Sequence, residues 1–198
     1  MIAKGDDRAS RTWRLIAALG LAMPVLTMMI LAAALSSEDD WIREPLSLSL
    51  LATRFTVLLL CVPALIVFIA IVRRSPVLVV TAGGVSLAQS FLAFSGATFG
   101  FLLPAVLLLA LGIRAGGAED ASPPTRRDLL KGSVVFALVC ASWLVVLGTT
   151  ETRCWSTDVA TGCTSGAPSS HGVLGAIALV AIASAVAWRT PGGSPPGR

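Results

Sequence analysis

Of the 198 residues in the chain, 55% are hydrophobic and 13% are charged, and the mean hydropathy is +0.83. Soluble domains carry about 25% charged residues, so this chain has about half the charge that a water-facing surface needs. The composition excludes a soluble enzyme, a disordered chain and a small secreted disulfide scaffold. The uncharged apolar runs have the ~20-residue length that crosses a ~30 Å hydrocarbon core. We therefore expect an all-α integral membrane protein.

The hydrophobic runs predict a single membrane domain, a bundle of six transmembrane helices joined by short loops. The expected spans cover residues 13–35, 53–72, 76–93, 97–113, 132–149 and 172–188, with a flexible tail at 191–198. The decisive stretch is 75–113, which holds 39 residues without a charge. One helix of that length would reach ~58 Å, nearly twice the membrane thickness. Two helices with a turn at 95–98 fit better.

The positions of lysine and arginine test the number of spans independently, because cytoplasmic loops are enriched in both residues. With both termini in the cytoplasm, six spans place 12 basic residues inside and three outside, namely Arg43, Arg54 and Arg153. If 75–113 formed one helix, the counts would become 7 and 8. The asymmetry favours six spans. The preference for arginine over lysine and the abundant alanine indicate a bacterial protein of the plasma membrane.

The net charge of +4 follows from these topology determinants, which also contact anionic lipid headgroups. No clustered basic face with aromatic side chains indicates nucleic-acid binding. The expected partners are the lipid bilayer and a membrane-protein partner or a second copy of the chain. Cleavage of the first span as a signal peptide is the alternative to its retention, although its apolar region exceeds the ~7–15 residues of a signal core.

Two cysteines, Cys154 and Cys163, fall in the expected outer loop 149–170, and we expect a disulfide between them. Disulfides persist in non-cytoplasmic compartments, and loop closure gives about 2.7 kcal/mol for so short a ring. The Gly, Ser and Thr content of the loop predicts little other structure. A metal site with Asp158 and His171 matches no zinc spacing, and a redox pair would show Cys-x-x-Cys spacing. No metal or cofactor is expected.

Gln89 is the only side-chain amide of the chain and falls inside the expected third span. It shares a helix face with Ser86 one turn earlier, and Ser90 adds a further hydroxyl. Polar groups in hydrocarbon seek partners on other helices for about 0.6–2 kcal/mol each. An interhelical contact is the main interpretation and solute binding the alternative. Gly96 and Gly100 form a small-xxx-small pattern, which predicts helix packing.

The segment 125–131, which contains Arg126 and Arg127, resembles a twin-arginine export signal. Such signals usually lie at the amino terminus, whereas this one is internal. A basic cytoplasmic flank of the fifth span explains the same residues more simply.

The cores of the expected spans contain no Asp, Glu, Lys, Arg or His. Proton relays, ion-coupled carriers and voltage sensors depend on such residues, and no nucleophile or metal constellation for an intramembrane hydrolase can be assembled. We therefore expect no enzyme, but a scaffold, accessory or envelope-associated module. The alternative is a small passive transporter or channel for a neutral or small solute, lined by the third and fourth helices.

Overall fold

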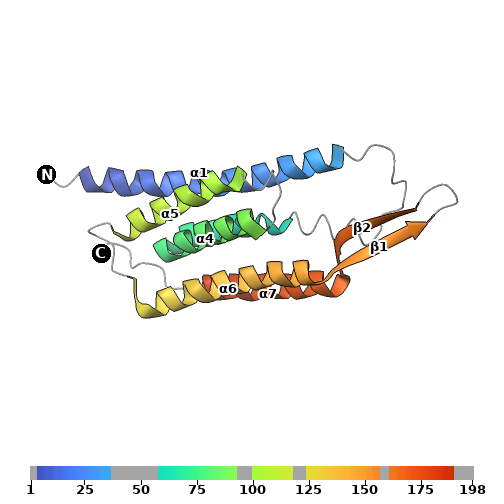
Figure 1. Cartoon of the computed structure of the whole chain (residues 1–198). Helices are drawn as coiled ribbons and strands as arrows, with labels where there is room; N and C mark the ends of the chain where they lie inside the picture. The colour runs from blue at the N-terminus through green and yellow to red at the C-terminus, as the bar shows by residue number, and fades with distance from the viewer. Residues whose placement is uncertain (1–3, 37–57, 93–99, 118–123, 157–160, 190–198) are drawn as a thin grey trace.

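The structure is a computed structural model and describes residues 4–36, 58–92, 100–117, 124–156 and 161–189. The helices of this described part are α1 (Lys4–Ser36), α3 (Val62–Arg73), α4 (Pro76–Leu92), α5 (Leu102–Gly116), α6 (Arg126–Gly148) and α7 (Ser170–Trp188). Two strands, β1 (Thr150–Ser156) and β2 (Thr161–Pro168), connect α6 to α7. The helices lie side by side along one long axis, and the strands project beyond one end of the bundle (Figure 1).

Three helices in the described part are long and apolar enough to cross a membrane, over Ser10–Met29 in α1 and over the whole of α6 and α7. Only 22% to 33% of their most apolar windows is buried inside the molecule. Large aliphatic side chains cover the outward faces, such as Leu21 at 71% and Leu174 at 64% exposure. Apolar surface of this extent is typical of contact with lipid or a partner. The helices therefore support a membrane location.

The expectation of six spans is met only in part, because α3, α4 and α5 are short. They contain 12, 17 and 15 residues, which corresponds to about 18–26 Å against a ~30 Å hydrocarbon core. α3 begins at Val62 after a turn at 60–61, and α5 follows a 3₁₀ turn at 100–101. Residues 53–57 of the expected second span and the expected turn at 95–98 lie outside the described residues.

Helix direction alternates along the chain, so several helix ends meet at one end of the bundle (Figure 1). A Cβ at Gly116, the last residue of α5, would lie 3.7 Å from the Cβ of Pro76, the first residue of α4. Lys131 Nζ, near the start of α6, donates to the carbonyl oxygen of Arg189 after α7 over 3.0 Å. We call this the basic end, because the helices and caps that meet there carry Arg8, Arg11, Arg14, Arg73, Arg74, Arg114, Arg126, Arg127, Lys131 and Arg189.

A two-residue turn at the basic end reverses the chain between α3 and α4. The backbone N–H of Ser75 donates to Ala70 over 2.9 Å and that of Arg74 donates to Ile71 over 3.2 Å. These two bonds are the Schellman pattern that ends many helices. Arg74 adopts the left-handed conformation that this motif requires, with φ 48°.

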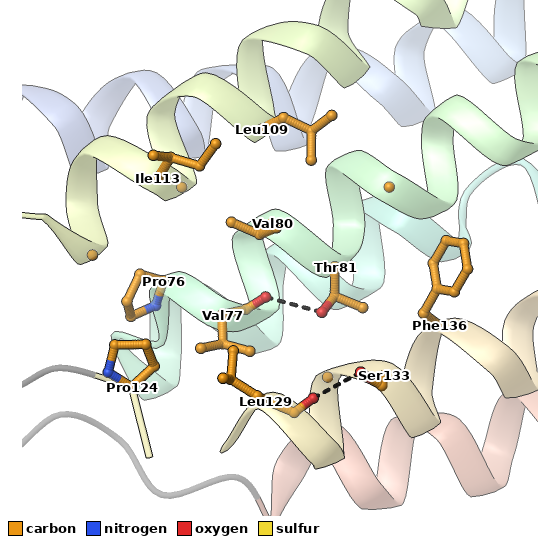
Figure 2. Close-up of a pocket in the computed structure, with 14 residues that line it drawn as sticks. Pro76, Val77, Val80, Thr81, Leu109, Ile113, Pro124, Leu129, Ser133 and Phe136 are labelled. Atoms are coloured by element: carbon orange, nitrogen blue, oxygen red, sulfur yellow. Dashed lines mark hydrogen bonds between the residues drawn. The ribbon is translucent and has the colours of Figure 1, made fainter. Parts of the chain in front are cut away.

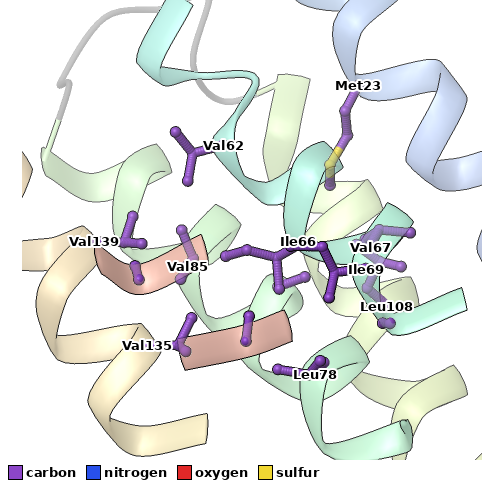
Figure 3. Close-up of a cluster of buried hydrophobic side chains, with 14 of the residues drawn as sticks. Met23, Val62, Ile66, Val67, Ile69, Leu78, Val85, Leu108, Val135 and Val139 are labelled. Carbon is purple, nitrogen blue, oxygen red and sulfur yellow. The ribbon is translucent and has the colours of Figure 1, made fainter. Parts of the chain in front are cut away.

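The core of the bundle is aliphatic and centres on α4, which contacts α3, α5 and α6. Figure 3 shows side chains of this cluster, among them Met23 of α1, Val67 of α3, Val85 of α4, Leu108 of α5 and Val135 of α6. Buried alanines of α7 complete it. The core therefore joins the short helices to the long ones as a single packed unit.

Two glycines allow α4 and α5 to approach at backbone distance. A Cβ at Gly83 would lie 2.9 Å from the backbone nitrogen of Leu109, and one at Gly112 would lie 2.9 Å from that of Val80. Of the two glycines expected to pack helices, Gly96 lies outside the described residues. At the other, Gly100, an added Cβ would lie 3.5 Å from Leu26 of α1, which is an ordinary van der Waals contact rather than a close approach.

The expectation of little structure in the loop 149–170 is wrong, and the fold is not purely helical. β1 and β2 pair in antiparallel fashion, with Cys154 opposite Cys163 and a register irregularity after Glu151. At the base of this hairpin, the N–H of Ser169 donates to the carbonyl oxygen of Thr149 over 3.0 Å. Gly, Ser and Thr are common in loops, but threonine is also favoured in strands.

Candidate functional site: an apolar groove at the basic end

A groove of about 490 Å³ lies between α4, α5 and α6, within the ~300–1,000 Å³ typical of ligand sites. Pro76 and Pro124 lie at its end nearest the basic residues, and Phe136 lies at the inner end (Figure 2). α4 forms the floor and the other two helices form the walls. The large apolar side chains that line it include Val77, Val80, Leu109, Ile113, Leu129 and Phe136.

Glycines leave this space open while they hold the helices together. A Cβ at Gly132 of α6 would lie 2.8 Å from Val77 Cγ1 and 2.9 Å from Thr81 Oγ1, so α6 approaches α4 closely here. A Cβ at Gly112 of α5 would lie 2.9 Å from the backbone nitrogen of Val80, so α5 also approaches α4 closely. Gly84, on the floor, would direct a Cβ toward the ring of Phe136 at 3.4 Å. Gly112 and Gly132 therefore set the spacing of the two walls from α4, and Gly84 is the floor position from which a side chain would extend into the groove.

The hydroxyl groups that line the groove are already hydrogen-bonded to the backbone. Thr81 Oγ1 donates to the carbonyl oxygen of Val77 over 2.9 Å, and Ser133 Oγ donates to that of Leu129 over 3.0 Å (Figure 2). The other described lining residues are aliphatic, aromatic, proline or glycine. A polar solute would lose its hydration here without gaining a hydroxyl donor, so the groove suits hydrocarbon.

Positive charge borders the groove at the start of α6. Arg126 lies three residues before Leu129 and seven before Ser133, so it continues the groove face by one turn. Arg127, the next residue, lies ~100° around the helix from Arg126 and therefore off the groove face. Arg114 lies in the last turn of α5, next to the lining residue Ile113 but ~100° around the helix from it. All three arginines are exposed, which gives the groove an apolar interior and a cationic mouth.

A capping box fixes the start of α6 beside this mouth. Thr125 Oγ1 accepts a hydrogen bond from the N–H of Asp128 over 3.3 Å, and Asp128 Oδ2 accepts from the N–H of Thr125 over 3.1 Å. These reciprocal bonds satisfy two amide donors. α6 therefore begins at Arg126, six residues before the expected start at 132, and the twin-arginine-like pair occupies its first turn.

The polar side chains singled out on α4 lie away from the groove. Ser86, Gln89 and Ser90 are all buried, with exposures of 0% to 1%, and helical periodicity places them on the side of α4 opposite Val80 and Gly84. Ser86 Oγ donates to Ala82 of its own helix over 3.0 Å. Ser90 likewise has its hydroxyl bonded to the carbonyl oxygen of Ser86 over 2.9 Å.

Gln89 reaches across to another segment of the chain. Its Nε2 donates to the carbonyl oxygen of Leu59 over 3.1 Å. Within the described residues, Gln89 Oε1 has no hydrogen-bond partner, and neither has the indole nitrogen of the buried Trp143 on α6. The sequence gives no signal for Trp143, because a tryptophan within a hydrophobic span is most simply interpreted as a packing residue.

The remaining candidates do not assemble into a reactive site in the described part of the chain. Cys61 and Cys140 are free, half-buried thiols, and His171 is exposed in the first turn of α7. No group of three metal-ligating side chains occurs among the described residues, and Asp158 lies outside them. The register places the backbones of Cys154 and Cys163 opposite each other. The side chains of both strands lie outside the described part of the structure, so the disulfide stays a prediction.

Comparison of the chain with protein-family models, with curated proteins and with solved structures found no match.

Proposed function

We propose that the chain is a six-span protein of the plasma membrane with both termini in the cytoplasm, and that it acts as a non-catalytic scaffold or accessory module. The observation that carries the proposal is the gathering of basic residues at one end of a bundle whose outward faces are apolar. Cytoplasmic flanks carry such a bias, so the basic end would face the cytoplasm and the hairpin would face outward.

The short helices fit this arrangement because long helices support them. α4 packs against α5 and α6, and the tight turn at Arg74 returns the chain across the bundle after α3. Bilayers adjust to a mismatch of a few Å by thinning, at fractions of a kcal/mol per Å. A 17-residue helix of ~26 Å is therefore long enough to cross in this setting.

The polar side chains buried in the described core support a packing role. They are Thr27, Ser75, Thr81, Ser86, Gln89, Ser90 and Ser142. None of these titrates in the physiological range, whereas proton relays and ion-coupled carriers use ionisable groups within the membrane. The alternative of a solute path lined by α4 and α5 would require those helices to separate, because Gly83 and Gly112 bring their backbones into contact.

Reporter fusions test the topology. Green fluorescent protein fused after Gly116 and after the carboxyl terminus is expected to fluoresce in the cytoplasm. Alkaline phosphatase inserted in the hairpin, after Gly162, is expected to be active outside. If the fusions at Gly116 and the terminus report opposite sides, the six-span proposal is wrong.

Purification in a mild detergent tests the role. A scaffold or accessory module should co-purify with a stoichiometric membrane partner or as a defined oligomer, and it should give no solute flux in proteoliposomes. Flux of a neutral solute above that of empty vesicles would instead favour the passive transporter. A matched vesicle preparation with Gly83→Leu, which forces α4 and α5 apart, controls for leakage caused by loosened packing.

A further inference from the structure

We propose that the groove between α4, α5 and α6 holds one acyl chain of an anionic phospholipid, whose headgroup phosphate contacts Arg126. The assignment of this lipid to the inner leaflet rests on the proposed topology. The binding itself does not depend on it.

The groove interior matches hydrocarbon in its chemistry. Its hydroxyls, on Thr81 and Ser133, are both bonded to carbonyl oxygens of their own helices. The walls open outward through side chains that are well exposed, with Ile113 of α5 at 67% and Leu129 of α6 at 52%. An acyl chain from the surrounding bilayer would pack against these apolar surfaces by van der Waals contact, and no polar group would have to be desolvated.

The length and direction of the groove match one leaflet. Its floor extends from Pro76 to Gly84, eight residues along α4, or ~12 Å at 1.5 Å per residue. Half of a ~30 Å hydrocarbon core is ~15 Å. The groove starts at the basic end and runs inward along the helix axes (Figure 2), as a lipid chain does below its headgroup.

The charge at the mouth selects an anionic headgroup. Arg126 lies on the groove face of α6, and an arginine fork binds phosphate oxygens in bidentate fashion. Arg114, in the last turn of α5, adds positive charge at this end of the bundle without lying on the groove face. The carboxylate of Asp128 has Oδ2 engaged by Thr125, while its Oδ1 is buried without a hydrogen-bond partner among the described residues; this single negative charge is outnumbered by Arg126 and Arg127 beside it. A basic recess between helices on the cytoplasmic side is typical of anionic-lipid sites.

A helix from a partner or a second copy fits the groove less well. A helix with its side chains is ~10–12 Å wide, and the floor of the groove, from Pro76 to Gly84, would offer it contact over only about two turns. Such a helix would also leave Arg126 without a counter-charge unless it carried an acidic residue in register.

Native mass spectrometry of the full-length protein tests the proposal, with dioleoylphosphatidylglycerol and dioleoylphosphatidylcholine titrated into the same micelles. The wild type should retain one phosphatidylglycerol in preference to phosphatidylcholine. Arg126→Gln should lower that preference about fivefold, the equivalent of ~1 kcal/mol for one basic residue near the headgroups. Arg127→Gln, which removes the same charge one position away from the groove face, should change it less than twofold.

Filling the groove gives the second arm. Gly84→Leu directs a side chain toward Phe136 and should abolish retention of both lipids, whereas Gly148→Leu, at a site with nothing within 4 Å, should leave retention unchanged. Thermal unfolding of each variant confirms that it is folded. The Arg126→Gln and Arg127→Gln pair decides the outcome even if Gly84→Leu does not fold.

Several outcomes would overturn the proposal. Equal losses from Arg126→Gln and Arg127→Gln would mean diffuse attraction rather than a site, and unchanged retention in folded Gly84→Leu would place the lipid elsewhere. A dimer that retains no lipid and that Gly84→Leu dissociates would assign the groove to a second copy. Lipid binding in micelles does not depend on the orientation of the protein in a membrane. If the reporter fusions contradicted the proposed topology, these binding results would still hold, and only the assignment of the lipid to the inner leaflet would change.

Discussion

Gly83 of α4 and Leu109 of α5 meet at backbone distance, since a Cβ at Gly83 would lie 2.9 Å from the backbone nitrogen of Leu109 and 3.0 Å from the carbonyl oxygen of Ala105. Backbone atoms cannot move aside as a side-chain tip can. In a membrane, where lipid is as apolar as the helices, association depends on such close packing. This contact therefore fixes the spacing of α4 and α5.

Replacing Gly83 tests that dependence. Gly83→Ala is expected to destabilise the protein by about 1–3 kcal/mol, the usual cost of overpacking a tight contact. Unfolding by dodecyl sulfate in mixed micelles measures it. Gly148→Ala is the matched control, because no atom lies within 4 Å of the added Cβ, and it should be neutral or slightly stabilising. Equal stability of the two variants would contradict the close approach of α4 and α5.

Gln89 fills space as well as donating its hydrogen bond, and two substitutions separate the contributions. Gln89→Leu keeps most of the volume but removes the bond to Leu59, and it also removes the Oε1 atom, which has no partner among the described residues. Interhelical hydrogen bonds in membranes average ~0.6 kcal/mol, so a loss below about 1 kcal/mol is expected. Gln89→Ala also opens a cavity, and a larger loss of about 2–3 kcal/mol is expected.

The same micelle titration compares these two variants. Ser184→Ala on α7 serves as the control, since its hydroxyl bonds to Val180 of its own helix and its loss should have little effect. If Gln89→Leu were as damaging as Gln89→Ala, hydrogen bonding rather than packing would be the main role of this side chain.

Helix boundaries could be predicted from the sequence where charged residues flank the apolar run. They were predicted less well where the helix begins at a capping box within a charged segment. The expected span 76–93 agrees closely with α4 at Pro76–Leu92, and 172–188 agrees with α7 at Ser170–Trp188. The start of α6 was missed because hydropathy stops at charged residues. The signal was present, since Thr125 and Asp128 have the three-residue spacing of an N-terminal cap.

The groove could not be predicted from the sequence. It exists because Gly112 and Gly132 bring two helices onto α4. The distances depend on contacts with residues 32 to 55 positions earlier in the chain, namely Val80, Val77 and Thr81. Periodicity identifies a face of one helix, but it does not say which faces meet. The hairpin was missed for a related reason, because its strands are defined by pairing with each other rather than by hydrophobic alternation.

Arg74 has positive φ at the end of α3, and glycine there should relieve strain. A non-glycine residue in the left-handed region costs roughly 1–2 kcal/mol, so Arg74→Gly is expected to stabilise the protein by about 1 kcal/mol. Arg74→Ala removes the same charge but keeps the Cβ, and it should not stabilise. Thermal unfolding in detergent distinguishes the two. A higher melting temperature for both variants would attribute the gain to charge instead of backbone conformation.

The pairing of Cys154 with Cys163 yields a prediction for the hairpin. Residues directly opposite in antiparallel strands have Cα atoms ~4.5–5.5 Å apart, inside the ~4.4–6.8 Å that a disulfide requires. Non-reduced protein purified from membranes should therefore bind maleimide at Cys61 and Cys140 alone, and at all four cysteines after reduction and unfolding. Loss of the bridge in the double serine variant should lower stability by about 2.7 kcal/mol by loop-closure entropy.

Moving one cysteine by one position along β1 tests the strand register on which the disulfide prediction depends. Position 155 pairs with Gly162, and neighbouring residues of a strand point to opposite faces of a sheet. The combined change Cys154→Ser and Trp155→Cys therefore moves the thiol to the other face, and Cys163 should then label freely without reduction. A bridge that formed equally well from position 155 would mean that the two strands slip past each other, and the pairing of Cys154 with Cys163 would not be specific.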